Sequence, residues 1–299
     1  MYRLIIPFAF SALLLPAQTP SRLDQMDHRI RAAIAGFHGA TSLYAKNLDS
    51  GVTYGIRENE KVRTASTIKL AIMATVFDSI AKGHGKWTDK LTLHDSDKVG
   101  GTGIIREFDD GTRLSIRDLV HVMIVLSDNT ATNLLLDKFP AETVNTFMDS
   151  LGLPNTRSMR KVLIDGKPPS GFSAAGRLEE NKRFGLGSTT PHEMGMLIEK
   201  MERGELVSPT ASREMIAILK RQQWRNGIAR RTGDLPVANK TGSLNLMRSD
   251  VGIVYSHGGR IVIAVTVDDL PKVDYSVDNA GDIFIADLTG MLLEGLAKN

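Results

Sequence analysis

The stretch Ala65-Ser66-Thr67-Ile68-Lys69-Leu70-Ala71-Ile72-Met73-Ala74 joins a possible reactive pair to the start of a strongly apolar segment. Residues 70–77 are apolar on nearly every face, which predicts a buried central helix. Ser66 and Lys69 are three residues apart, so in a helix that begins at about Ser66 the hydroxyl and the amine share one face. A helix start also offers free backbone N–H groups and partial positive charge, which favour negative charge developing at the serine.

Two other serine–lysine pairs have the same spacing, Ser79 with Lys82 and Ser158 with Lys161. The first pair lies at the end of the predicted central helix, where Gly83 stops it, and the second lies in a loop-like region. Both pairs are therefore interpreted as ordinary surface residues, and the sequence context favours Ser66 as the nucleophile.

Composition bounds the class of protein. The 299 residues are 42% hydrophobic, which allows a substantial core in one large domain or two small ones. The chain has no cysteine, which excludes disulfides, thiol catalysis and a lipid-modified cysteine. The formal net charge is +3, with both signs interspersed, so no nucleic-acid partner is expected. Seven histidines without metal-ligand spacing predict no metal site, and no cofactor is expected.

The N-terminus is typical of a secretory signal peptide. Residues 4–15 are almost wholly apolar and are followed by Pro16-Ala17-Gln18, which predicts cleavage near Ala17 and a mature chain of residues 18–299. The alternative is an uncleaved anchor, but twelve apolar residues interrupted by Pro7 are short for a membrane span. No later stretch is long and apolar enough to cross a bilayer. The sequence therefore predicts a secreted or periplasmic protein with no stable membrane anchor.

Hydrophobic periodicity predicts strands near both ends of the chain and helices between them. The predicted strands are residues 41–47, 51–57, 237–240, 251–255 and 261–267, and the terminal helices are residues 22–34 and 278–296. This order predicts an α+β fold, an α/β sandwich in which one antiparallel sheet from both termini is flanked by helices and carries an inserted all-helical subdomain. We expect a single catalytic domain over residues 18–299, with an α/β part at about 18–64 and 208–299 and a helical part at about 65–207. Residues 154–188 are expected to form a long polar loop.

Two further motifs each occur once in the chain: Ser127-Asp128-Asn129 between two predicted helices, and Lys240-Thr241-Gly242-Ser243 at the end of a predicted strand. Either motif alone is a weak signal. In this order, with Ser66-Thr67-Ile68-Lys69 upstream, the three motifs together predict one active site. A purely structural role would leave Ser66, Lys69, Ser127 and Lys240 converging by accident.

This set of motifs resembles that of class A β-lactamases and penicillin-binding proteins. The resemblance extends to Gly103-Ile104-Ile105-Arg106 and to residues 119–136, 144–153 and 236–242, so it covers about residues 24–296. It implies the two-part fold of that family, with the active site in a cleft between the sheet and the helical part.

The resemblance also implies a catalytic role for four residues. Ser66 would attack a strained or peptide-like carbonyl carbon and form an acyl-enzyme, while Lys69, as a neutral amine, would take its proton. Burial and the nearby Lys240 cation would lower the pKa of Lys69. Ser127, hydrogen-bonded to Lys240, would relay a proton to the leaving nitrogen. The backbone N–H groups of Ser66 and Ser243 would form the oxyanion hole.

The substrate-binding residues follow from the same resemblance. Asn129 would hold the side-chain amide of the substrate. The Lys240-Thr241-Gly242-Ser243 segment would receive the carboxylate that β-lactams and acyl-D-Ala-D-Ala share. Arg248 is a further candidate anchor, because an arginine can grip a carboxylate through two hydrogen bonds. The alternative is a solvated arginine in a hairpin.

One position departs from the family pattern. A class A β-lactamase uses a loop glutamate to activate the water that removes the acyl group. By resemblance this glutamate should fall near Val162, where the sequence has none. The acids of the loop are Asp165, Glu179 and Glu180. Glu180 or Glu179 could hold a water against Ser66 and act as the base for deacylation. The alternative is that both are ordinary solvated surface residues, as exposed loop glutamates usually are.

Three functions therefore remain open. The first is a class A-like β-lactamase with an unorthodox base, and the second is a D-alanyl-D-alanine carboxypeptidase or related peptidoglycan hydrolase. The third is a penicillin-sensing or penicillin-binding domain that stays acylated, which would normally need a membrane-spanning partner segment. The expected partners are a small-molecule β-lactam or a peptidoglycan stem peptide, and the protein is expected to be a monomer.

Overall fold

The computed structural model describes residues 21–163 and 171–297. The signal peptide predicted at residues 1–17 and the loop acid Asp165 lie outside these ranges. The α-helices are α1 (Arg22–Ala35), α2 (Lys69–Ala81), α3 (Ile116–Val125), α4 (Asn129–Lys138), α5 (Ala141–Ser150), α6 (Ala174–Arg177), α7 (Pro191–Glu202), α8 (Pro209–Leu219) and α9 (Ala280–Leu296).

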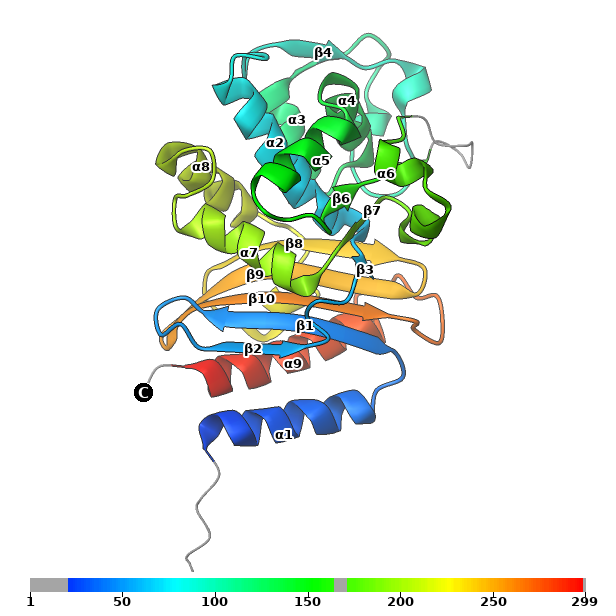
Figure 1. The fold of residues 1–299 in the computed structure, drawn as a ribbon. Helices are drawn as coiled ribbons and strands as arrows, with labels where there is room; N and C mark the ends of the chain where they lie inside the picture. The colour runs from blue at the N-terminus through cyan, green and yellow to red at the C-terminus, as the bar shows by residue number, and fades with distance from the viewer. Residues whose placement is uncertain (1–20, 164–170, 298–299) are drawn as a thin grey trace, which may run out of the picture.

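One five-stranded antiparallel sheet forms the middle of the molecule (Figure 1). Its strand order is β2-β1-β10-β9-β8, with bounds β1 (Ala40–Asn47), β2 (Thr53–Ile56), β8 (Val237–Leu244), β9 (Met247–Ser256) and β10 (Gly259–Asp268). The hairpin β1–β2 comes from the N-terminal part of the chain and the meander β8–β9–β10 from the C-terminal part, and β1 pairs with β10 to join them. The predicted fold class, with one sheet built from both ends of the chain, is confirmed.

The two faces of the sheet bury two separate cores, as period-two alternation in β10 requires. Val262 and Ala264 face the core that the sheet shares with the helical part, which includes Ile72 of α2. Ile261 and Ile263 face the opposite core, under α1 and α9. In Figure 1 the two terminal helices cover one face of the sheet, while α7 and the other helices lie on the opposite side.

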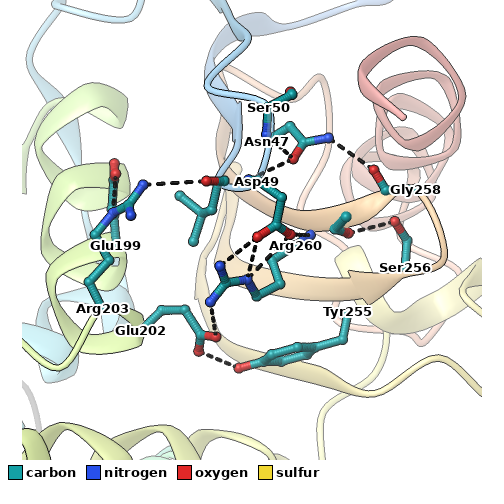
Figure 2. A network of polar contacts seen from close by, with 12 residues as sticks. Asn47, Asp49, Ser50, Glu199, Glu202, Arg203, Tyr255, Ser256, Gly258 and Arg260 are labelled. Atoms are coloured by element: carbon teal, nitrogen blue, oxygen red, sulfur yellow. Dashed lines mark hydrogen bonds and ion pairs between the residues drawn. The ribbon is translucent and has the colours of Figure 1, made fainter. Parts of the chain in front are cut away.

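Polar contacts join α7 to the end of the sheet at which the β1–β2 and β9–β10 turns lie (Figure 2). The Arg260 guanidinium of β10 donates to Glu202 of α7 at 3.2 Å and to Asp49 at 3.1 Å. The Tyr255 hydroxyl donates to the second oxygen of Glu202 at 2.6 Å. Because α7 also contacts β1 and β10 directly, this helix packs on the sheet although it falls within the part of the chain predicted to form the helical subdomain.

Short strands are where the structure departs from the sequence prediction. The paired strands β4 (Lys90–Thr92) and β5 (Arg113–Ser115), and the paired strands β6 (Arg157–Ser158) and β7 (Gly187–Thr189), lie where helices and loops were expected. β7 also pairs with β3 (Val62–Arg63), which lies just before Ser66. Strands of two or three residues are too short to show an alternating pattern.

The serines of the other two serine–lysine pairs also differ from expectation, since Ser79 and Ser158 are buried rather than on the surface. Across residues 21–163 and 171–297, none of the helices has the length and apolarity needed to span a membrane.

Candidate active site

Ser66 lies in a single 3₁₀ turn, η1 (Ala65–Ile68), which leads directly into α2. Residues i and i+3 eclipse in 3₁₀ geometry, so Ser66 and Lys69 lie on the same side of this turn. Ala65, immediately before the serine, has a φ of 47°, a left-handed conformation that is rare for a residue with a side chain. Ser66 itself is partly exposed, whereas Lys69 is fully buried.

The buried amine of Lys69 lies against the second motif. Its Nζ is 2.7 Å from the backbone oxygen of Ser127, 3.2 Å from Ser127 Oγ and 2.9 Å from Asn129 Oδ1. Burial, and next the Lys240 cation, hold the pKa of Lys69 well below its ordinary value, against the opposing charge of Asp128. A lysine with a lowered pKa has a larger neutral fraction near pH 7, and a neutral amine can accept a proton.

A tight turn before α4 presents Ser127 and Asn129. Ser127 has a φ of 57°, so its backbone is also in the left-handed region. The Asn129 side chain is fixed at both ends, because its Nδ2 donates to the Gly100 carbonyl at 3.0 Å while its Oδ1 accepts from Lys69. Thr102 completes the turn, since its hydroxyl donates to the Ser127 carbonyl at 2.7 Å.

Asp128, the middle residue of the motif, holds this turn in place. Its buried carboxylate caps α4 through the Ala131 N–H at 2.8 Å, and it accepts the N–H groups of Ile104 and Ile105 at 2.7 and 2.9 Å. The segment that contains Gly103 packs against it so closely that a Cβ at Gly103 would lie 2.3 Å from Asp128 Oδ2. The role of Asp128 is therefore to position the residues on either side of it.

Replacing Asp128 by alanine is expected to lower the free energy of unfolding by about 3 kcal/mol, because it removes a helix cap and leaves two more backbone N–H groups unpaired. Urea denaturation followed by circular dichroism measures this loss. Ser208→Ala is the matched control, since Ser208 caps α8 through the Ala211 N–H alone, and it should cost only about 1 kcal/mol. Equal losses in the two variants would contradict the bracing role of Asp128.

The third motif lies on β8, at the edge of the sheet beside η1. The backbone approach is close, since a Cβ at Gly242 would lie 2.7 Å from the Thr64 carbonyl oxygen and 3.2 Å from the Ser66 nitrogen. Glycine is therefore required at this position for the strand to lie against the serine. The next residue, Ser243, pairs with Arg248 of β9.

Lys240 belongs to the same strand, and its side chain is fully buried. Its Nζ donates to the Thr241 carbonyl at 2.8 Å. Burial lowers the pKa of Lys240 to about 7, and the buried carboxylate of Asp250 on β9 opposes this shift. Burial likewise raises the pKa of Asp250 to about 6, although Asn239 and the Ile228 N–H donate to it. The expected hydrogen bond between Ser127 and Lys240 is not among the contacts of the described residues, where Ser127 Oγ instead neighbours Lys69.

The lowered pKa of Lys69, together with the pKa of about 7 at Lys240, predicts a bell-shaped dependence of acylation on pH. The rate should rise as Lys69 loses its proton and should fall above about pH 7 as Lys240 loses the charge that would attract a substrate carboxylate. Asp250→Asn removes the charge that raises the Lys240 pKa, so the falling limb should move to lower pH. The measurement is the second-order acylation rate from pH 5 to pH 9.

The control for this experiment is Asp234→Asn, which removes an exposed carboxylate from the loop before β8. We expect it to leave both limbs in place. An Asp250→Asn profile that superimposes on that of Asp234→Asn would contradict the assignment of the falling limb to Lys240.

The three motifs meet at one cavity of about 510 Å³. Two of its walls come from the helical part and from β8, and the far end comes from β9 and the segment that leads into α9. The lining residues are Ser66, Gly101, Thr102, Ser127, Asn129, Trp224, Asn226, Thr241, Ser243, Arg248, Tyr275, Ser276 and Asp282. Lys69 and Lys240 lie behind this surface. Trp224, Tyr275 and Asp282 were not predicted, because they lie outside the three motifs.

Arg248 lies at the far end of the cavity and is almost fully buried. Its Nη1 donates to the carbonyls of Leu244 and Met247, both at 2.7 Å, and its Nη2 donates to the Asp274 carbonyl. Its Nε lies 3.3 Å from Asp282. Arg248 is thus no solvated hairpin residue. Most of its donors already have partners, so a substrate carboxylate would meet a positively charged wall with few free N–H groups.

The two glutamates proposed as deacylating bases lie elsewhere. Glu179 and Glu180 are exposed in the 3₁₀ segment η4 (Glu179–Phe184), and Glu179 pairs with Lys182 on the surface. Neither residue lines the cavity. Among the described lining residues, Asp282 is the one carboxylate, and it faces Arg248.

Val162, the position at which the family glutamate should fall, lies beside α4. Its N–H donates to Asn133 Oδ1 at 2.8 Å, and its carbonyl accepts from Asn133 Nδ2 at 3.1 Å. Asn133 is one helical turn after Asn129, so it lies on the same face of α4. The backbone of residue 162 is therefore fixed about one turn away from the side chain that contacts Lys69.

No group of three or more histidine, aspartate or glutamate side chains within residues 21–163 and 171–297 is arranged to hold a metal ion. The chemistry available to the described site is that of a partly exposed serine, two buried lysines with lowered pKa values, a second serine and strand-edge amides. This combination is typical of serine acyl transfer.

Comparison with known proteins places the chain in a family of this class. Residues 25–296 match the sequence model of the β-lactamase enzyme family, and the chain belongs to that family. β-Lactamase L2 of Stenotrophomonas maltophilia is 27% identical over 224 residues, which are 75% of this chain and 66% of that protein. β-Lactamase BRO-1 of Moraxella catarrhalis is 29% identical over 119 residues, 39% of this chain and 38% of that protein. The matched segments thus cover just under two thirds of the first relative and about two fifths of the second.

Solved structures agree over more of the chain. A β-lactamase from Sphaerobacter thermophilus superposes with a TM-score of 0.77 at 28% identity and covers 91% of this chain and 95% of its own. A protein named PBP-A superposes with a TM-score of 0.76 at 24% identity and covers 92% of this chain and 97% of its own. The second likeness concerns the fold alone.

Proposed function

We propose that this chain is an active-site-serine hydrolase of the class A β-lactamase type, which opens the β-lactam amide through an acyl-enzyme on Ser66. The observation that carries the proposal is the buried amine of Lys69, which contacts Ser127 and Asn129, has a lowered pKa and lies one turn after the cavity-lining Ser66. Family membership and the names of the relatives support the substrate class. Secretion through the N-terminal segment is part of the proposal.

Acylation would begin with attack of Ser66 Oγ on the amide carbonyl carbon. Lys69 takes the serine proton as the bond forms, and the amine is suited to this step because burial and the Lys240 cation disfavour its charged form. The negative charge that develops on the carbonyl oxygen is held by the N–H groups of Ser66 and Ser243. The close approach of β8 to η1 at Gly242 supports this pairing.

Collapse of the tetrahedral intermediate needs a proton on the leaving nitrogen. Ser127 supplies it and recovers a proton from Lys69, whose Nζ lies 3.2 Å from Ser127 Oγ. Lys240, Thr241 and Ser243 attract the substrate carboxylate, with Arg248 adding positive charge at the end of the cavity. Asn129 holds the side-chain amide of the substrate on the opposite side.

A second candidate function rests on the deacylation step. With Val162 in place of the family glutamate, and with Glu179 and Glu180 exposed, the described site has no carboxylate placed to activate a water at Ser66. This favours a D-alanyl-D-alanine carboxypeptidase or a slowly deacylating penicillin-binding protein. PBP-A, one of the structural neighbours, is known in a leucine-to-glutamate variant as an acyl-enzyme complex with penicillin G.

Intact-mass spectrometry of the purified protein after addition of benzylpenicillin tests both candidates. A mass increase that disappears within seconds while the drug is consumed would mean a β-lactamase. An increase that persists for minutes to hours would mean efficient acylation without deacylation and would favour the second candidate. Absence of both a mass increase and hydrolysis would overturn the proposal.

A further inference from the structure

Two aromatic side chains, Trp224 and Tyr275, line the cavity without any role in the acylation steps described above. Both are well exposed for aromatic residues, with 41% and 65% of their surface accessible. They come from different parts of the chain: Trp224 follows α8, and Tyr275 lies in the segment between β10 and α9. Exposed aromatic surface that lines a cavity is typical of a place where an apolar part of a ligand binds.

Each ring is held at its polar end. Trp224 Nε1 donates to the Leu126 carbonyl at 3.3 Å, one residue before Ser127, and the Tyr275 hydroxyl donates to Asn245 Oδ1 at 2.7 Å. The ring of Tyr275 also lies 5.2 Å from the Arg248 guanidinium carbon. Rings fixed in this way offer contact area at a small cost in conformational entropy.

The neighbours of the two rings show which half of a substrate they would meet. Trp224 donates a hydrogen bond to the carbonyl of the residue before Ser127, the serine that would protonate the leaving nitrogen. Tyr275 lies against Arg248, at the end of the cavity that would receive the carboxylate. Asn129, which would hold the acyl side chain, has its amide directed to Gly100 on the helical side. The rings therefore border the half of the cavity that receives the leaving nitrogen and the carboxylate.

We infer that Trp224 and Tyr275 form an aromatic rim that selects substrates with an apolar or aromatic substituent beside the carboxylate. This inference rests on the proposed function and assigns its substrate class. A terminal D-alanine has only a methyl group beside its carboxylate and offers little apolar surface to either ring. A cephalosporin carries a variable substituent at C3, next to the carboxylate-bearing carbon, and a large planar group there would contact the rim.

The test compares nitrocefin and cephalothin, which share a thienylacetyl side chain and differ at C3, where nitrocefin has a dinitrostyryl group and cephalothin an acetoxymethyl group. Second-order acylation rates are measured by stopped-flow absorbance and by intact mass. Trp224→Ala and Tyr275→Ala should each slow acylation by nitrocefin about tenfold and by cephalothin less than threefold. Trp224→Phe and Tyr275→Phe, which keep an aromatic ring, should recover most of the nitrocefin rate.

Val277→Ala is the control, because Val277 is an exposed apolar residue of the same segment that does not line the cavity. We expect it to leave both rates at the wild-type level. Equal loss with the two cephalosporins in the alanine variants, or no loss with nitrocefin, would overturn the aromatic rim while leaving the serine mechanism intact. A wild-type protein that neither cephalosporin acylates would instead overturn the proposed function.

Discussion

Ser66→Ala is expected to abolish covalent labelling by benzylpenicillin and to reduce any turnover by a factor on the order of 10⁶, as the loss of a nucleophile does in other serine hydrolases. The reason is local: Ser66 is the cavity-lining serine that shares a helical face with the buried amine of Lys69. Ser127 also lines the cavity, but its proposed role is to move a proton. Labelling is measured by intact mass and located by peptide mapping.

Ser79→Ala provides the matched control for this variant. Ser79 also precedes a lysine by three residues, but it is buried near the end of α2 and does not line the cavity. Because alanine is a good helix former, the variant should fold normally and keep full labelling. A Ser66→Ala protein that still acquires the mass of a penicillin would show that another residue is the nucleophile.

Val162→Glu is expected to shorten the lifetime of the acyl-enzyme by a factor of about 10² to 10⁴, the usual contribution of a general base. Asn133 fixes the backbone of residue 162 on both sides, one helical turn from Asn129. We expect a carboxylate at this position to reach the acyl group and to activate a water there. The measurement is the decay of the benzylpenicillin adduct by intact mass, with acylation followed separately.

Val162→Gln separates base catalysis from a change in shape, because it has nearly the same size as the glutamate but cannot accept a proton near neutral pH. Its adduct should last as long as that of the wild-type protein. If the glutamate and glutamine variants release penicillin at the same rate, then residue 162 does not face the acyl group and the deacylating base must be sought elsewhere. Unchanged acylation in both variants would show that the nucleophile is undisturbed.

The sequence was informative wherever one local pattern dictates one structure. The apolar run after Lys69 led to the prediction of α2, and the alternating runs of the last third of the chain led to β8, β9 and β10. Motif order led to a single site, and Ser66, Ser127, Thr241 and Ser243 do line one cavity, with Lys69 and Lys240 buried behind it. The structure adds that Ser66 lies in a 3₁₀ turn, which differs from an α-helix only in the hydrogen-bond partner of a few amides.

Contacts between distant segments could not be read in this way. Trp224 and Tyr275 are about fifty residues apart, and each lies in a stretch without a motif. The fixation of Arg248 by the carbonyls of Leu244, Met247 and Asp274 depends on how the segment before α9 folds back onto β9. The pKa of Lys240 likewise depends on the burial of its side chain and on the charge of Asp250 on the neighbouring strand. These features are set by tertiary packing, which no single stretch of sequence encodes.

The pairing of the terminal helices has a practical consequence for handling the protein. The Arg22 guanidinium donates to the Ala297 carbonyl at 3.0 Å, so the start of α1 and the end of α9 meet. Asp282, in the first turn of α9, lines the cavity at the other end of this helix. Asp282 and Ala297 are 15 residues apart along this helix, so at about 1.5 Å per residue they are separated by about 22 Å. Immobilising the enzyme on a sensor surface through the junction of α1 and α9 would therefore leave the cavity open to dissolved antibiotics.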